Sequence, residues 1–191
     1  KTAEAIQQFL SALRAESNNL SARFNLGLAL ITQGNFSDAA REYETARSAA
    51  PQDVDVKVNL GYAYARAGRL DEAQKAWEEA SRSASASAEA QNNLGVVYFA
   101  RGDSKQAEEA YLLAMKISPD LLEAKSNLAA VYVKAGKLDE ASDLYRKVLE
   151  KRSWDQEALV NLGTACLSKG QGAEAVRYLT TALANDPRNP Q

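Results

Sequence analysis

Residues 59–77 read Asn-Leu-Gly-Tyr-Ala-Tyr-Ala-Arg-Ala-Gly-Arg-Leu-Asp-Glu-Ala-Gln-Lys-Ala-Trp, and the main features of this stretch recur at a constant step of 34 residues. The step is clearest in the opening Asn-Leu pair, which is followed by Gly in four copies and by Ala in one. The five asparagines are Asn25, Asn59, Asn93, Asn127 and Asn161. A fixed period of this length indicates one supersecondary unit repeated along the chain.

Three further positions keep the same step and predict what each repeat forms. They are a glycine (Gly34, Gly68, Gly102, Gly136 and Gly170), an alanine (Ala39, Ala73, Ala107, Ala141 and Ala175) and a bulky residue (Tyr43, Trp77, Tyr111, Tyr145 and Leu179). Before that glycine the apolar residues have helical spacing, and a glycine free to take a left-handed conformation ends such a helix. A second helix then runs towards a proline at Pro51, Pro119 and Pro187. Each repeat is therefore predicted to be a helical hairpin, with small residues facing bulky ones.

This pattern resembles the tetratricopeptide repeat family, whose helix-turn-helix units place large, Leu, Gly, Tyr, Ala, aromatic, Ala and Pro residues at set positions. The resemblance covers essentially the whole chain. It implies an all-α fold, a right-handed superhelical solenoid of antiparallel helix pairs that forms a single continuous repeat domain. The expected repeats are residues 20–53, 54–87, 88–121, 122–155 and 156–189, with a half repeat at 1–19 and a tail at 190–191. The large residue usual at the fourth position is replaced by Arg23, Lys57, Gln91, Lys125 and Leu159.

Composition excludes several classes of function. The chain has 191 residues and a net charge of -2, so it lacks the basic surface that nucleic acids and anionic membranes usually require. No apolar run reaches the roughly 20 residues that a membrane-spanning helix needs. The single cysteine, Cys166, excludes an internal disulfide and is expected to be buried and inert. The compartment stays undecided, with the cytoplasm slightly favoured over the periplasm, and the chain, which starts at Lys1, is expected to be part of a longer protein.

The resemblance implies that the second, fifth, sixth, ninth, twelfth and thirteenth residues of each repeat face a concave channel. The five asparagines occupy the sixth position, and similar asparagine ladders line the repeats of O-linked N-acetylglucosamine transferases and kinesin light chains. A side-chain amide offers a donor and an acceptor, which match the two polar groups of each residue in an extended peptide. We therefore expect Asn25, Asn59, Asn93, Asn127 and Asn161 to contact a peptide backbone; alternatively, some of them bridge adjacent helices.

A mostly apolar strip accompanies the asparagines, at the fifth, ninth and twelfth positions. Its candidates for partner contact are Phe24, Leu28, Tyr62, Val96 and Phe99, because contiguous apolar surface and large aromatic side chains mark interaction sites. Arg66 and Lys134, at the thirteenth position, add basic points. The alternative is that part of this strip packs against the next repeat.

One known ligand of such repeats is not expected. Repeats that bind the acidic C-termini of heat-shock chaperones carry Lys and Asn at the fifth and ninth positions of their first unit. Those positions hold Phe24 and Leu28 in the first complete repeat and Val58 and Tyr62 in the second. The carboxylate clamp is missing, so a chaperone tail is not predicted as a ligand.

The sequence carries no motif that predicts catalysis. Phosphate-binding loops, dinucleotide fingerprints and nucleophile elbows are absent, and the chain has no histidine. Paired acids such as Asp71-Glu72 and Asp139-Glu140 are expected to begin second helices, where the helix dipole favours them. We therefore predict a non-catalytic scaffold for a protein or peptide partner, with no metal or cofactor.

Two other functions stay open. An assembly scaffold would use terminal or convex surfaces, and Val176, Leu179 and Leu183 have no obvious cover, so copies could associate end to end. A substrate-recruiting arm would serve a larger enzyme such as a glycosyltransferase. Trp154, in the loop before the last repeat, is expected to cover that junction, with an exposed contact as the alternative.

Overall fold

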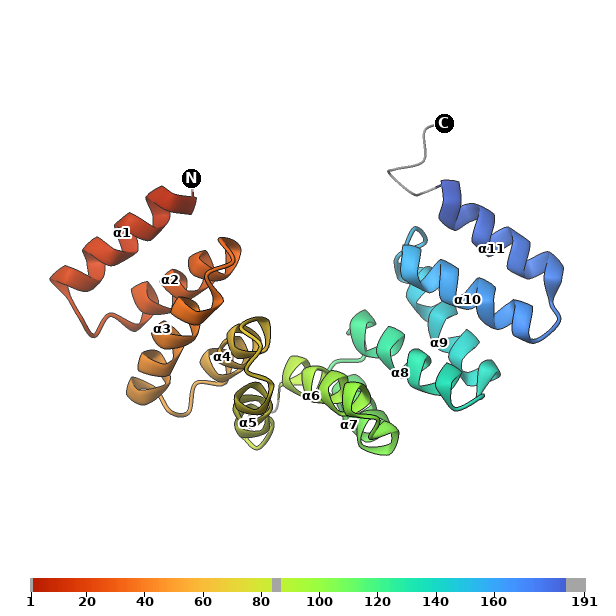
Figure 1. Ribbon diagram of the computed structural model, residues 1–191, viewed down its shortest axis with the longest axis horizontal. Coiled ribbons are helices and arrows are strands. Elements are labelled where there is room, and N and C mark those ends of the chain that lie inside the picture. The colour runs from red at the N-terminus through yellow and green to blue at the C-terminus, as the bar shows by residue number, and fades with distance from the viewer. Residues whose placement is uncertain (1, 84–86, 185–191) are drawn as a thin grey trace. The chain divides into compact units, whose positions relative to one another are not determined.

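The computed structural model describes residues 2–83 and 87–184, which form eleven α-helices joined by short loops (Figure 1). The helices are α1 (Thr2–Ala15), α2 (Leu20–Thr32), α3 (Phe36–Ala49), α4 (Val54–Arg66), α5 (Leu70–Ser81), α6 (Ala88–Arg101), α7 (Ser104–Ile117), α8 (Leu122–Lys134), α9 (Leu138–Lys151), α10 (Gln156–Ser168) and α11 (Gly172–Ala184). The described residues include no strand, so the prediction of an all-α fold is confirmed.

The chain divides into two compact halves, Lys1–Val97 and Tyr98–Gln191, called the N-terminal and the C-terminal half below. The division falls within α6. From α1 to α5, and again from α7 to α11, each helix packs against the helices that precede and follow it in the sequence. Such nearest-neighbour packing is typical of repeat proteins. The repeat boundaries given above stay predictions.

First helices of the repeats begin at a capping side chain that itself follows the 34-residue step. Its oxygen accepts a hydrogen bond from the backbone N–H three residues later, which satisfies one of the free donors at the helix start. The distances from the capping side-chain oxygen to the backbone N are 2.9 Å for Asn19 with Ala22, 3.0 Å for Asp53 with Val56, 3.2 Å for Ser87 with Ala90 and 3.0 Å for Asp155 with Ala158. Only α8 lacks this device among the described first helices, because Leu121 stands at its cap position.

The same helices end as the glycine pattern predicts. Gly34 and Gly68 both have a φ of 80°, in the left-handed region, and the three equivalent glycines have similar values. The left-handed glycine lets the backbone N–H of the next residue donate to a carbonyl of the last helical turn. The Asn35 N–H donates to the Leu30 carbonyl at 2.9 Å, and the Arg69 N–H to the Tyr64 carbonyl at 2.8 Å. This closes each first helix and starts the loop to the second.

The two helices of a repeat meet where a glycine faces a bulky side chain. A Cβ atom on Gly27 would lie 2.5 Å from the Tyr43 ring, and one on Gly61 would lie 2.4 Å from Nε1 of Trp77. The Trp77 Nε1–H also donates to the carbonyl of Val58 at 3.1 Å. The aromatic ring thus fills the space that the missing side chain leaves, and the predicted structural role of Trp77 is confirmed.

In the C-terminal half, a continuous core runs from α7 to α11. It includes the buried residues Tyr111, Leu128, Val148 and Leu162 together with Cys166, which has no exposed surface. Burial raises the pKa of the Cys166 thiol, which disfavours the reactive thiolate. The expected burial of Cys166 is confirmed, and its low reactivity stays a prediction.

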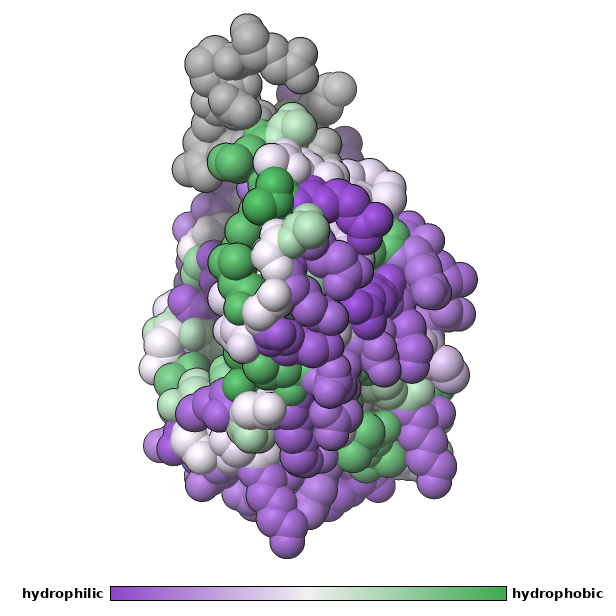
Figure 2. Space-filling model, turned by 90° about the vertical axis from the view of Figure 1, so that its right-hand side faces the viewer, coloured by the Kyte–Doolittle hydropathy of each residue, from purple (hydrophilic) through white to green (hydrophobic). Residues whose placement is uncertain are grey.

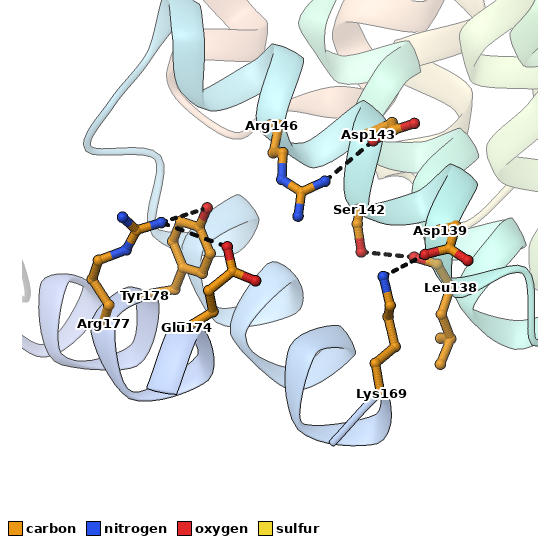
Figure 3. A network of polar contacts seen from close by, with 9 residues as sticks. All are labelled: Leu138, Asp139, Ser142, Asp143, Arg146, Lys169, Glu174, Arg177 and Tyr178. Carbon is orange, nitrogen blue, oxygen red and sulfur yellow. Dashed lines mark hydrogen bonds and ion pairs between the residues drawn. The ribbon is translucent and has the colours of Figure 1, made fainter. Parts of the chain in front are cut away.

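Polar contacts among residues of α9, α10 and α11 accompany this core (Figure 3). Lys169, just after α10, forms an ion pair with Asp139 at the start of α9, and the hydrogen bond from Lys169 lowers the pKa of that carboxyl group. The buried Ser142 hydroxyl donates to the carbonyl of Leu138 at 2.7 Å. Because exposed ion pairs contribute little to stability, the apolar core carries the packing of these helices.

Both ends of the described chain leave apolar side chains incompletely covered. No residue of α1 is fully buried. On α11, Val176 and Leu183 are exposed and Leu179 is half-buried. Figure 2 views the side on which α11 lies and shows a hydrophobic strip bordered by hydrophilic residues. Association of copies through this strip stays a prediction.

Replacing Gly61 with alanine is expected to lower the urea concentration at the midpoint of unfolding. The new methyl group would displace Trp77, and overpacking of this kind typically costs about 1–3 kcal/mol. The matched control is Gly172→Ala in α11, where nothing lies within 4 Å of the added Cβ. Circular dichroism during urea titration measures both, and a Gly61→Ala midpoint equal to that of the control would contradict the close approach.

Candidate functional site

The first helices expose large apolar residues at the positions predicted from the sequence. The exposed residues at the fifth, ninth and twelfth positions are Leu28, Tyr62, Val96, Val133, Val160 and Leu167. Their side chains are between 37% and 54% exposed, whereas the leucine two residues before the ninth position is buried in every repeat, as Leu26 and Leu60 illustrate. Exposed apolar residues in a fixed register form a surface on each first helix, called the first-helix face below.

The five asparagines lie on these helices in different environments. Asn25 is exposed and its side chain forms no hydrogen bond with a described residue, and Asn93 and Asn127 are half-buried. The Asn59 amide donates to the carbonyl of Asp55 in its own helix at 2.8 Å. Asn161 is hydrogen-bonded to the hydroxyl of Tyr145, whose pKa burial raises to about 12. At least one asparagine therefore bridges helices, as the alternative reading of the ladder expected.

Each predicted basic residue lies beside a predicted aromatic residue. The Arg66 guanidinium donates to the Tyr62 hydroxyl at 2.7 Å and lies 4.4 Å from the centre of the Phe36 ring. In the C-terminal half, Nζ of Lys134 lies 5.0 Å from the centre of the Phe99 ring. Contact with a ring face favours a cation and fixes its position. The sequence pattern did not single out Phe36, which starts a second helix.

Phe24 is half-buried, and its ring meets the Tyr43 ring edge-on with 5.6 Å between centres. With Asn25, it lines a cavity of about 240 Å³ between α2, α3 and α4. The Tyr43 hydroxyl is buried without a hydrogen-bond partner among the described residues, and burial raises its pKa. This cavity brings together two of the residues predicted to contact a partner.

The charged residues at the fourth position, which departed from the family pattern, have structural roles. Lys57 and Lys125 are buried, and their amines donate to the Ser83 hydroxyl and to the Pro119 carbonyl. Arg23 pairs with Glu42 at 2.6 Å. A long side chain can bury its aliphatic stem and still bring its charge to a polar partner, so it replaces a large apolar residue here.

The prediction that Trp154 covers the junction before the last repeat is wrong, because its side chain is 67% exposed. Two hydrogen bonds of Asp155 hold the chain at this junction instead. The Asp155 N–H donates to the carbonyl of Arg152 at 3.0 Å, and the Asp155 carboxylate caps α10. Neither contact involves the indole of Trp154, which extends into solvent.

Other classes of site find no support in the part of the chain that the structure describes. It holds no group of three or more His, Cys, Asp or Glu residues placed to bind a metal ion. None of its helices is long and apolar enough to cross a membrane. The acid pairs Asp71-Glu72 and Asp139-Glu140 lie in the first turns of α5 and α9, as predicted.

Comparison with known families gives matches along the chain. Tetratricopeptide repeat models match residues 1–54 and 25–75, residues 54–120 and 86–153, and residues 132–191. The chain belongs to the tetratricopeptide repeat family. Its fold is the all-α solenoid of that family, and such repeats are typically non-catalytic scaffolds for protein partners.

Solved structures of other tetratricopeptide repeat proteins resemble this chain. The crystal structure of MamA is 28% identical, with a TM-score of 0.73, and the match covers 84% of this chain and 94% of MamA. PilF of Pseudomonas aeruginosa is 19% identical with a TM-score of 0.80, covering 89% of this chain and 78% of PilF. YrrB is described as a tetratricopeptide repeat protein with an unusual peptide-binding site. It is 20% identical with a TM-score of 0.70, and the match covers 94% of this chain and 93% of YrrB. None of the curated proteins compared with the chain matches it.

The contrasting positions of the two tryptophans can be measured by fluorescence. A Trp77→Phe variant, which keeps only Trp154, is expected to emit at long wavelength and to be quenched readily by acrylamide. A Trp154→Phe variant keeps the buried Trp77 and is expected to emit at shorter wavelength and to be protected. Equal quenching of the two variants, with native circular dichroism, would contradict the exposure of Trp154.

Proposed function

We propose that this chain is a protein-interaction scaffold that holds an extended peptide segment of its partner against the first-helix face. The observation that carries the proposal is the fixed register of exposed apolar side chains on successive first helices, represented by Leu28, Tyr62 and Val96. Members of the family generally bind protein or peptide partners, and the description of YrrB as having a peptide-binding site agrees with this reading.

Apolar contact would supply most of the binding free energy. Burying apolar surface yields about 25 cal/mol per Å² before the costs of association, so several half-exposed side chains can support a useful affinity. The asparagines would add backbone recognition. Asn25 is exposed, and the hydrogen bond that Asn59 makes to Asp55 leaves its amide oxygen available as an acceptor. Asn93 in the N-terminal half, and Asn127 and Asn161 in the C-terminal half, are proposed to make the same kind of contact on their own helices.

Arg66 in the N-terminal half and Lys134 in the C-terminal half would each orient a peptide segment bound to its own half. Both are exposed, and each is positioned by an aromatic ring, Phe36 and Phe99 respectively. A cation positioned in advance loses less side-chain freedom when it meets a carboxylate of a partner. Because the clamp residues for chaperone tails are missing, such a carboxylate is expected on a side chain within a mainly apolar segment.

Self-association is a second candidate function, favoured by the exposed side chains of Val176 and Leu183 on α11. It would use a different surface from the first-helix face. Sedimentation velocity of the chain and of a Leu183→Ser variant separates the two. A concentration-dependent dimer that the substitution removes would favour assembly, whereas a monomer at all concentrations would exclude it.

The peptide-binding proposal is tested with peptides selected from a displayed random 12-residue library and measured by fluorescence anisotropy. Leu28→Ser and Val96→Ser are expected to weaken binding about tenfold each, the usual effect of removing a central apolar contact. The matched controls are Ile117→Ser and Leu112→Ser on α7. Ile117 is 38% exposed, like Leu28, and Leu112 is 46% exposed against 45% for Val96.

The two pairs lose the same kind of surface, so only a difference between the faces supports the proposal. If the α7 variants lose binding and the first-helix variants keep it, the peptide binds elsewhere and the proposal is wrong. The same holds if selection yields no peptide that binds the chain.

A further inference from the structure

The cavity between α2, the end of α3 and the start of α4 has walls of two chemical kinds. Its apolar wall consists of Leu20, Phe24, Ala46 and Val56, contributed by all three helices. Its volume of about 240 Å³ lies below the range of roughly 300–1,000 Å³ that is typical of pockets for whole small molecules. The cavity therefore suits one long side chain of a partner better than a free metabolite.

The polar wall carries negative charge. Asp53 and Asp55 line the cavity beside the Ser21 hydroxyl, and none of the described lining residues is basic. Neither carboxylate forms an ion pair with a residue that the structure describes. Asp53 uses one oxygen to cap α4 through the Val56 N–H at 3.0 Å, which leaves its second oxygen free.

Two helix N-termini also meet at this cavity and would by themselves favour an anion. Their free N–H groups are already partly satisfied, since Asn19 caps α2 and Asp53 caps α4. Two full negative charges outweigh the remaining partial positive charge of the helix ends. The cavity therefore favours a cation.

We propose that this cavity binds the side chain of a lysine or arginine in the peptide that the first-helix face holds. The aliphatic stem would lie against Phe24 and Val56, and the charged end would reach Asp53 and Asp55. Long basic side chains combine these two properties, an apolar stem and a cationic tip. The inference rests on the proposed function for the peptide context, but the preference of the cavity for a cation does not.

The equivalent positions at the junction before the last repeat carry a different combination of residues. The cap and the acid recur there as Asp155 and Glu157, but the place of Phe24 is taken by Ser126. Among the residues at this fifth position, Phe24 is the only aromatic one. The combination of an aromatic wall with two carboxylates is therefore particular to the junction of the first two complete repeats.

The test is a titration of the ¹⁵N-labelled chain monitored by heteronuclear NMR. The three probes are Nα-acetyl-lysine methylamide, which keeps its charged side-chain amine, and the corresponding norleucine and glutamate compounds. The lysine probe is expected to shift the amide signals of Ser21, Phe24 and Val56 and to bind at least about fivefold more tightly than the norleucine probe, the effect of an ion pair with two carboxylates. The glutamate probe is expected to leave those signals unchanged.

The informative variant is Asp53→Asn with Asp55→Asn, because asparagine caps a helix as well as aspartate does while the charge is removed. It is expected to reduce lysine binding to the level of norleucine. The matched control, Asp155→Asn with Glu157→Gln, removes the same charge and keeps the equivalent cap of α10. This control is expected to bind lysine as the unmodified chain does.

Equal affinity for the lysine and norleucine probes, or an affinity for lysine that is not reduced in the double Asp53 and Asp55 variant, would overturn the proposal. If the selected peptides bind through Leu28 and Val96 while the lysine probe leaves Phe24 and Val56 unshifted, the cavity assignment fails and the proposed function stands. If the lysine probe binds and no peptide does, the cation site stands and the proposed function fails.

Discussion

The close approach of two helices at a glycine is the constraint on which the rest of the structure depends. At Gly61, the ring of Trp77 occupies the space where a Cβ atom would lie, and Tyr43 does the same at Gly27. This contact fixes the rotation of the first helix about its own axis. Once the glycine faces inwards, the leucine before it is buried, and the ninth position, which directly follows the glycine, turns towards solvent. The exposed register of Leu28, Tyr62 and Val96 is thus a consequence of the packing inside each repeat.

The ends of the first helices keep this arrangement in phase from repeat to repeat. A capping side chain such as Asp53 marks where the helix starts, and a left-handed glycine such as Gly68 marks where it stops. With both ends fixed, the first helices have nearly the same length, and the exposed positions recur at the same distance from the start of each helix. Leu121 lacks the cap, yet α8 still begins one residue after it, because packing of Leu128 and Val131 holds the helix in place.

Features that depend on one repeat alone could be predicted from the sequence. The period, the left-handed glycines and the burial of Trp77 and Cys166 all follow from residues within a single hairpin. Features that depend on what a neighbouring element supplies could not. The exposure of Trp154 follows from the turn that Asp155 closes. Likewise, the pairing of Lys125 with the Pro119 carbonyl depends on where the previous helix ends, which the periodic pattern does not specify.

This division also separates the parts of the chain that hold the fold from those that can differ between partners. The glycine-to-aromatic contact tolerates little change, since a methyl group at Gly61 would collide with Trp77. Contacts at the junctions between repeats differ from one junction to the next: Tyr64 donates to Glu44 at one junction, and Lys137 pairs with Glu108 at 3.7 Å at another. Because the cavity beside Phe24 lies at such a junction, its charge and shape can change without disturbing the helical hairpins. In the proposed function, the first-helix face would therefore supply the affinity for an extended peptide, and the junctions would supply the selectivity for a partner.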